Sequence, residues 1–432
     1  MDILLKGGTI IDPDRNMEET GDVLVRDGKI LKTGGDLSAQ TSGQTKVLDV
    51  QKLYVVPGLI DIHVHFRDPG FPAKETIETG AAAAAAGGFT TVVCMPNTQP
   101  VIDNMETINY INGKAAKAPC NVLMMGSVTL GEDGKECSPY REMLEGGIVG
   151  ITDDGKPVMD SGVLYEAMMQ AKELKLPVSS HCEDMGLCYD RTITTGKTAE
   201  KLGVHGVPPL AEEIIIQRDI MVAEATGAHL HIQHISSAKG VELVRQAKAR
   251  GVRVTAEAAP HHFTLSEESV LIHGTHAKMS PPLRTPEDVK AVIQGLVDGT
   301  IDAIADDHAP HTPEEKSRSM LEAPNGIIGI ETTLGVSLHS LVHAGHLSFR
   351  ELIEKLTINP ARLLNIPRGT LRDNACADIT VIDPQKEWVV DSSKFRSKAR
   401  NTPYEGMKLK GKAVITICRG EIVHNEHGEA HV

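Results

Sequence analysis

Residues 57–70 read PGLIDIHVHFRDPG, and this stretch decides how the rest of the chain is interpreted. The run from 58 to 66 is strand-like and is bounded by Gly and Pro. His63 and His65 flank Val64, so both imidazoles face the same side of that strand. Two neutral imidazoles at this spacing can hold one divalent ion. A lone H-x-H pair is often incidental, so the pattern needs support from elsewhere in the chain.

The same kind of strand recurs along the chain, each time separated from the next by a helical segment. Eight strand-like runs are found: GLIDIHVHF, FTTVVCMP, NVLMMGSVT, IVGITDD, PVSSHCE, HLHIQHIS, VRVTAEAAP and IDAIADD. This alternation predicts an α/β fold, a closed (β/α)8 barrel of the TIM type. An open doubly wound sheet is the alternative, but it would carry a Gly-rich phosphate loop after its first strand, and GLIDIHVHFRDPG is no such loop.

Both ends of the chain have a different sequence pattern from the middle. Short strand-like runs broken by Gly and Asp, such as ILLKGGTIID near the start and AVITICRGEIV near the end, replace the strand–helix alternation. We therefore expect residues 1–57 and 368–432 to form one small composite β domain. Residues 58–367 would form the barrel.

Composition narrows the function classes. The 432 residues include 44 Lys and Arg against 58 Asp and Glu, a formal net charge of −14. That balance argues against nucleic-acid and membrane partners, which need a basic face, but allows a small anionic substrate. The N-terminal residues show no secretion signal, and the seven cysteines form no C-x-x-C pair. We therefore expect a reduced, cytoplasmic protein.

Polar side chains stand where the predicted strands end, which is where barrel enzymes place their chemistry. His, His, Asp, His, His and Asp make an N/O ligand set suited to zinc or a similar metal. Six ligands exceed what one tetrahedral ion needs, so a two-metal site is expected. The residues at these strand ends are His63, His65, Asp153, Asp154, His181, His234, Asp306 and Asp307. His229 and His231 lie upstream of His234, and whether they are core residues or functional ones stays open.

The motifs PGLIDIHVHFRDPG, MPNT, TDDG, HCED and DHAPH resemble the amidohydrolase superfamily and, within it, type I dihydroorotase. The resemblance extends over essentially the whole chain. H-x-H is shared by the superfamily, whereas H-F-R-D-P-G together with M-P-N-T is much narrower. The resemblance implies zinc-dependent, reversible cyclisation of N-carbamoyl-L-aspartate to (S)-dihydroorotate, a step of pyrimidine (UMP) biosynthesis. It also implies one or two Zn²⁺ ions per subunit, expected as a binuclear centre.

The resemblance also implies roles for individual residues. His63 and His65 resemble ligands of the more buried metal, His181 and His234 ligands of the second, and Asp154 the bridge between them. Asp307 resembles both a ligand and the general acid/base. Asp153 and Asp306, the sequence neighbours of Asp154 and Asp307, are expected to be structural. The residues that resemble substrate contacts are His65, Arg67, Asn97, Ser280, His311, Asn325 and Gly326.

Two positions depart from the family pattern. Ser280 stands before PPLR where Asn is expected, and Asn325–Gly326 stands where Phe–Gly is expected. These departures concern recognition of the ring rather than of the metals. Three alternatives stay open: a hydantoinase-like enzyme, an allantoinase-like enzyme, and an inactive barrel that scaffolds a carbamoyltransferase assembly. Among partners we expect a second copy of the chain, and association with aspartate carbamoyltransferase is also open.

Overall fold

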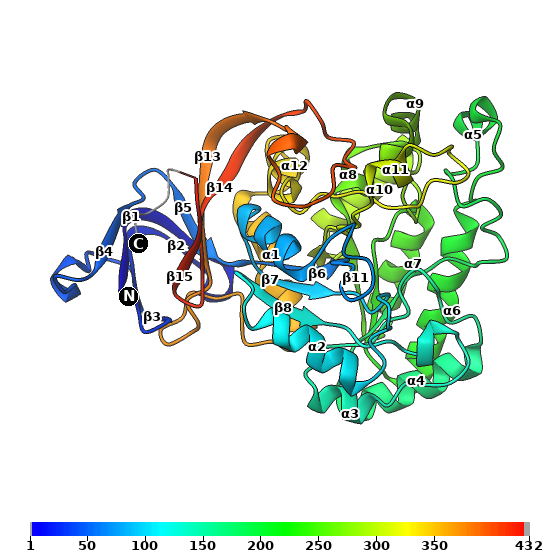
Figure 1. Ribbon diagram of the computed structural model, residues 1–432, viewed down its shortest axis with the longest axis horizontal. Helices are drawn as coiled ribbons and strands as arrows, with labels where there is room; N and C mark the ends of the chain where they lie inside the picture. Colours follow the sequence, from blue (N-terminus) through cyan, green and yellow to red (C-terminus); the bar gives the residue numbers. More distant parts are fainter. Residues whose placement is uncertain (1, 427–432) are drawn as a thin grey trace.

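The computed structural model describes residues 2–426 and places a β-rich unit beside a helix-covered barrel (Figure 1). Strands from the two ends of the chain, blue and red in the figure, lie together in the β-rich unit. Within residues 2–426, no helix combines the length and the apolar character that crossing a bilayer requires.

The barrel consists of two parallel arcs of strands that single backbone bridges join. One arc has the order β6-β7-β8 and the other β12-β11-β10-β9. Ile151 bridges both Gly126 and Val178, and Val64 bridges His308, so the ring closes on both sides. The strands are β6 (Leu59–Val64), β7 (Phe89–Cys94), β8 (Asn121–Met124), β9 (Val178–Ser180), β10 (Leu230–Ile232), β11 (Val254–Ala258) and β12 (Ala303–Ile304).

The predicted fourth strand is the element that differs most from expectation, because within residues 2–426 its only ladder contacts are the bridges at Ile151. The carboxylate of Asp153 explains where the ladder stops. It accepts the backbone N–H groups of Val128 and Thr129 at 2.7 and 3.1 Å, and so replaces the next strand-to-strand bonds. The chain therefore leaves the barrel directly after Thr152, and Asp153 and Asp154 lie in the segment that follows.

Seven predicted helices are present, and polar caps set where several of them begin. Thr76 and Thr285 each form a capping box, and Asp160 accepts the N–H groups of Gly162 and Val163. The seven are α1 (Ile77–Ala86), α2 (Met105–Ala115), α3 (Tyr140–Glu145), α4 (Ser161–Leu174), α6 (Leu210–Thr226), α7 (Ala238–Ala249) and α10 (Pro286–Val297).

Further helices lie in the loops and after the last barrel strand. The loop helices are α5 (Lys197–Leu202), α8 (Pro260–Thr264), α9 (Val270–His273) and α11 (Pro313–Lys316), and those nearer the C-terminus are α12 (Thr333–Ser337), α13 (Phe349–Leu356) and α14 (Ile358–Leu363).

Both ends of the chain contribute to one eight-stranded sheet, as predicted for the small β domain. Its order is β15-β14-β13-β5-β1-β2-β3, with β4 paired to β1. The ends meet where β5 and β13 pair antiparallel, with Val55 opposite Val381. The strands are β1 (Ile3–Asp12), β2 (Met17–Arg26), β3 (Lys29–Thr33), β4 (Lys46–Asp49), β5 (Tyr54–Pro57), β13 (Ile379–Val389), β14 (Lys408–Cys418) and β15 (Glu421–Asn425).

Gly58 joins this sheet to the first barrel strand. A Cβ atom at this position would lie 2.0 Å from Oγ1 of Thr90, so no larger residue fits between β5 and β6 without a shift. This tight junction supports our proposal of a domain boundary at 57/58, with the return boundary at 367/368.

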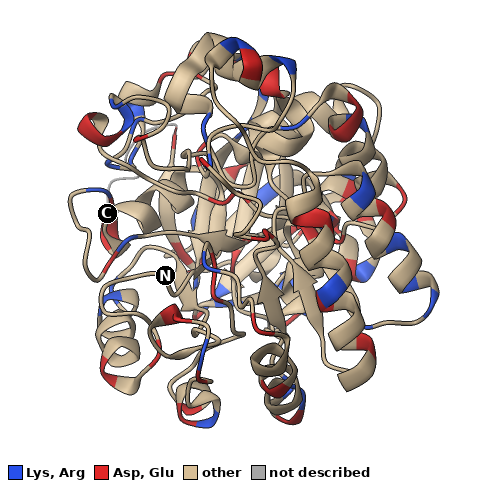
Figure 2. Ribbon diagram, turned by 90° about the vertical axis from the view of Figure 1, so that its right-hand side faces the viewer, with Lys and Arg blue, Asp and Glu red and all other residues tan. Residues whose placement is uncertain are grey.

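Charged residues are distributed over the helices at the outside of the molecule. Figure 2 shows acidic and basic residues interspersed along these ribbons.

Candidate metal centre and active site

The barrel closure brings the first and last strands together at one rim. The backbone N–H of His65 donates to the carbonyl of His308 at 2.8 Å, beside the bridge between Val64 and His308. This pairing places the two histidines at the end of β6 next to Asp307. Strand order alone could not specify that contact, because it depends on the ring closing.

His63, His65 and Asp307 form the first cluster of candidate ligands. Nε2 of His65 lies 3.0 Å from Oδ1 of Asp307, and Nε2 of His63 lies 3.6 Å from the same oxygen. All three side chains are buried, and their ligand atoms lie within 4.8 Å of one another. One divalent ion could be held by this group.

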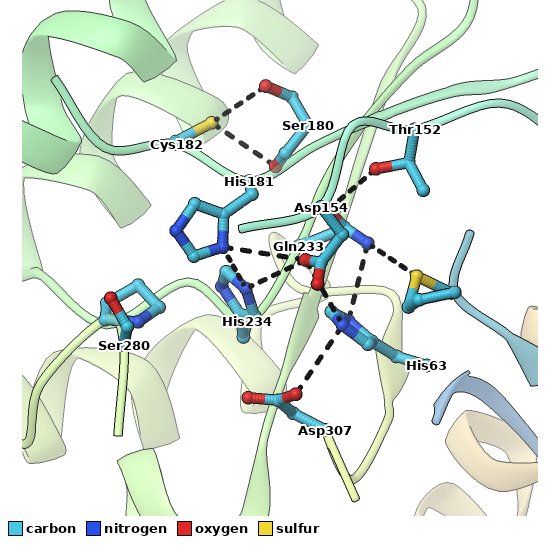
Figure 3. A network of polar contacts seen from close by, with 12 residues as sticks. His63, Thr152, Asp154, Ser180, His181, Cys182, Gln233, His234, Ser280 and Asp307 are labelled. Carbon is cyan, nitrogen blue, oxygen red and sulfur yellow. Dashed lines mark hydrogen bonds and ion pairs between the residues drawn. The ribbon is translucent and has the colours of Figure 1, made fainter. Parts of the chain in front are cut away.

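Asp154 lies between that cluster and two more histidines (Figure 3). Its Oδ1 is 3.4 Å from Nε2 of His63, 3.6 Å from Nδ1 of His181 and 3.8 Å from Nε2 of His234. The facing nitrogens of His181 and His234 are 2.9 Å apart. A carboxylate in this position can bridge two ions, as the resemblance implies for Asp154.

Unpaired polar atoms at the centre of this group provide a test of whether a metal fits. Nε2 of His63 and Oδ1 of Asp154 are buried without a hydrogen-bond partner among residues 2–426. Buried polar atoms are rarely left so, and a cation would satisfy both. The donor set of imidazole nitrogen and carboxylate oxygen suits a first-row divalent ion. The residues present therefore fit a metal centre.

The electrostatics of the group agree with this interpretation. Burial raises the pKa of Asp154, but the three surrounding imidazoles hold that pKa well below its usual value. Burial lowers the pKa of His63 and of His181, but neighbouring carboxylates outweigh it, so the pKa of His63 lies well above its usual value and that of His181 rises to about 9. Opposite charges are thus concentrated where little water can screen them.

The polar residues next to or upstream of the candidate ligands in sequence have other partners. Asp153 accepts from Val128 and Thr129, away from the cluster, and Oδ1 of Asp306 accepts from the hydroxyl of Thr333 at 2.6 Å. His229 and His231 both contact Oγ1 of Thr255 at 2.9 Å. None of these four side chains belongs to the two metal-binding groups found among residues 2–426.

A cavity of about 500 Å³ opens beside the candidate ligands. It contains every residue expected to contact substrate, and it also reaches Asp154, His181, His234 and Asp307. The expected substrate contacts that line it are His65, Arg67, Asn97, Ser280, His311, Asn325 and Gly326. Their individual roles stay predictions, and each side chain has its own set of contacts in the structure.

Arg67 and Arg191 both line this cavity with a buried Nε that has no hydrogen-bond partner among residues 2–426, and Arg67 is the one expected to contact substrate. Burial lowers the pKa of Arg67, although Asp307 and Asp154 raise it. Its backbone φ of 59° lies in the left-handed region, as do those of His234 (30°) and Asp307 (54°). Such strained non-glycine residues cluster at functional sites.

Asn97 and Ser280 already contact candidate ligands or their neighbours. Oδ1 of Asn97 lies 3.0 Å from Nδ1 of His65, and its Nδ2 donates to Oδ2 of Asp154 at 3.3 Å. The hydroxyl of Ser280 donates to Oε2 of Glu183. Serine at this position is therefore engaged with a buried carboxylate, whereas the expected Asn would have been longer and offered a second polar group.

His311 and Gly326 also line the cavity. Nε2 of His311 donates to the carbonyl of Asn325 at 2.8 Å, while Lys74 faces its Nδ1 at 3.3 Å. Burial, and then the charges of Arg67 and Lys74, hold the pKa of His311 well below its usual value, so it is neutral. The N–H of Gly326 donates to the carbonyl of Lys278 at 3.0 Å.

Two buried glutamates were not singled out from the sequence, although both touch candidate ligands. Glu257 is the charged residue within the strand VTAEA, and Glu183 follows His181 by two positions. A carboxylate inside an Ala-rich buried strand is rare without a partner, and that was the available signal.

Solved structures with this architecture place the fold in a class. L-Hydantoinase (dihydropyrimidinase) from Arthrobacter aurescens is similar with a TM-score of 0.89 and 26% identity, covering 100% of this chain and 97% of that one. D-Hydantoinase (dihydropyrimidinase) from Thermus sp. is similar with a TM-score of 0.86 and 26% identity, covering 99% and 96%. The barrel, the composite sheet and the His/Asp clusters together define a cyclic-amide hydrolase of the amidohydrolase class.

Sequence relatives narrow the class further. The family model described as Dihydro-orotase-like matches residues 52–240. Dihydroorotase from Clostridioides difficile (strain 630) is 49% identical over 98% of this chain and 100% of its own length, and dihydroorotase from Pelotomaculum thermopropionicum is 50% identical over 98% of each. The chain belongs to the dihydroorotase family. These relatives favour that family over the hydantoinase-like and allantoinase-like alternatives.

Proposed function

We propose that this chain is a zinc enzyme that interconverts N-carbamoyl-L-aspartate and (S)-dihydroorotate, a step of pyrimidine (UMP) biosynthesis. The observation that carries the proposal is the position of Asp154 between two groups of buried histidines, in one cavity with Asp307 and Arg67. Family membership supplies the substrate.

The six candidate ligands would hold two Zn²⁺ ions. His63, His65 and Asp307 would hold the first, His181 and His234 the second, and Asp154 would contact both. When bound, zinc supplies a Lewis acid that polarises the amide carbonyl and makes water acidic enough to attack near neutral pH.

Asp307 would transfer the proton. In ring opening its carboxylate accepts a proton from the attacking water and delivers it to the ring nitrogen as the C–N bond breaks and a C–O bond forms. In ring closure the same residue works in reverse. The contacts of Asp307 with His63 and His65 run to Oδ1, and the other oxygen points away from His63 (Figure 3).

Arg67 would bind the carboxylate that does not react. A guanidinium presents a planar fork that matches a carboxylate with two hydrogen bonds. Asn97 and His311 line the same cavity and would limit the substrate's rotation, which keeps the reacting carbonyl beside Asp307. His311 is neutral, so it would contact the substrate carboxylate without adding a positive charge to the cavity.

A direct assay tests this proposal and the alternatives together. Dihydroorotate, hydantoin, dihydrouracil and allantoin are supplied to one preparation whose metal content is measured. We expect kcat/KM for dihydroorotate to exceed kcat/KM for the other three rings by about 100-fold or more, because only dihydroorotate carries a ring carboxylate that can pair with Arg67. Faster turnover of hydantoin or allantoin would identify a different cyclic amidase, and a zinc-loaded chain inactive on all four would support a scaffold.

We also propose that the chain forms a homo-oligomer in the cytoplasm. Helices α4 and α6 expose large apolar side chains, with Tyr165 47%, Met169 39%, Ile214 40% and Met221 61% exposed. Exposed apolar groups of this kind mark protein interfaces, and the seven unpaired cysteines fit a reducing compartment. Light scattering after size-exclusion chromatography should give a multiple of the subunit mass, and Met221→Glu should lower it.

The same measurement with added aspartate carbamoyltransferase tests association with that enzyme. A larger complex would support it, and unchanged elution of both proteins would contradict it. A monomer mass for the wild-type chain at assay concentration would contradict the homo-oligomer.

A further inference from the structure

His63 is held from behind by a buried carboxylate. Its outer nitrogen, Nδ1, lies 2.6 Å from Oε1 of Glu257, and both side chains are 1% exposed. A contact this short between an imidazole nitrogen and a carboxylate oxygen requires a proton on the nitrogen. A histidine binds a metal in its neutral form, so Nε2, which faces Asp154 and Asp307, carries the lone pair when a metal is bound.

Glu257 is itself fixed by its other contacts. Its Oε2 lies 3.0 Å from Nε2 of His231, whose Nδ1 contacts Oγ1 of Thr255 at 2.9 Å. Its Oε1 also accepts the backbone N–H of His234 at 3.4 Å. The Glu257 carboxylate, on β11, therefore contacts candidate ligands from β6 and from the end of β10. Its contact with His231 fixes its second oxygen.

His181 has the same arrangement with its nitrogens exchanged. Nε2 of His181 lies 2.8 Å from Oε2 of Glu183, and the hydroxyl of Ser280 donates to that same oxygen. Nδ1 is the nitrogen that faces Asp154 and His234. Ser280 is thus connected to the metal centre through Glu183.

We propose that Glu257 and Glu183 are positioning residues that hold His63 and His181 in opposite tautomers, so that Nε2 of His63 and Nδ1 of His181 bind the metals. This inference rests on the proposed metal-dependent function. A carboxylate behind a ligating imidazole orients the ring and increases its basicity, and its loss typically weakens metal binding by about 10- to 100-fold.

Charge balance supports the same assignment. Asp154 and Asp307 alone would leave two buried divalent ions with excess positive charge, which is costly away from water. With Glu257 and Glu183, four carboxylates contact the imidazoles of the centre. Their formal charge matches that of two divalent cations.

The test compares Glu257→Gln and Glu183→Gln with the wild-type chain in the zinc-loaded state. Transfer of Zn²⁺ to a chromophoric chelator reports the two dissociation constants without substrate. We expect each variant to weaken one of the two sites by about 10- to 100-fold. Asp378→Asn is the matched control, because Asp378 is a buried carboxylate that pairs with Arg368 in the β-rich unit and touches none of the candidate ligands.

The outcomes separate this inference from the proposed function. Unchanged zinc affinity in both variants, while the wild type binds two ions, would overturn the positioning role alone. A wild-type chain that binds no Zn²⁺ would overturn the metal-dependent function and this inference with it. A purely structural role would lower thermal stability without changing zinc affinity, as we expect for Asp378→Asn.

A measurement on the wild type keeps the proposal testable if a variant does not fold. Imidazole ¹⁵N chemical shifts of the zinc-loaded chain distinguish protonated from metal-bound nitrogens. We expect His63 to be protonated at Nδ1 and His181 at Nε2. The reverse assignment at either histidine would contradict the proposal.

Discussion

Asp307→Asn is expected to lower kcat for dihydroorotate by about 10²- to 10⁴-fold while KM stays close to that of the wild type. Asparagine keeps the shape of the side chain and one oxygen near His63 and His65, but it cannot accept and return a proton. The left-handed backbone of Asp307, with a φ of 54°, is compatible with Asn, which tolerates this region well.

The measurement is steady-state kinetics in both directions on protein of known zinc content. Asp12→Asn serves as a control, since Asp12 is a buried carboxylate at the end of β1 that accepts the N–H of Leu371 and does not line the cavity. Near-wild-type turnover by zinc-replete Asp307→Asn would show that another group transfers the proton.

Arg67→Ala should have the second largest effect, chiefly on KM. The ring carboxylate would lose its two-pronged partner, at a cost of roughly 2–4 kcal/mol, which corresponds to about 30- to 900-fold. Arg67→Lys should recover part of this loss, because it restores the charge but not the fork.

Dihydrouracil supplies the control substrate, since its ring carries no carboxylate. Arg67→Ala should change kinetics with dihydrouracil far less than with dihydroorotate. Equal losses on the two rings would indicate that Arg67 acts by supporting the loop after β6 rather than by binding substrate.

The architecture could be read from local patterns along the chain. Strand-like and helix-like runs alternate from residue 58 onward, and each run carries its own apolar periodicity and its own caps, as Thr76 and Thr285 show. The composite sheet was also predictable, because both chain ends carry short strand-like runs broken by Gly and Asp. The fourth strand was not, since its length depends on Asp153 taking over backbone N–H groups of a neighbouring segment.

The candidate ligands were predictable for a related reason. The ends of parallel strands meet at one rim, so His63, His181 and Asp307 had to lie near each other once the barrel was assumed. The choice of Asp154 over Asp153 came from the family resemblance, and the structure places Asp154 among the histidines and Asp153 away from them.

The sequence by itself therefore determined the barrel, the composite sheet and the residue types gathered at the rim, because periodicity and strand ends are local properties. Only the tertiary structure decided which nitrogen of each histidine faces inward, that Ser280 donates to Glu183, and that Glu257 stands behind His63. Glu257 lies 194 residues from His63 along the chain. Contacts of that kind depend on how the barrel closes and on the direction of each side chain, and neither is written in any local stretch of sequence.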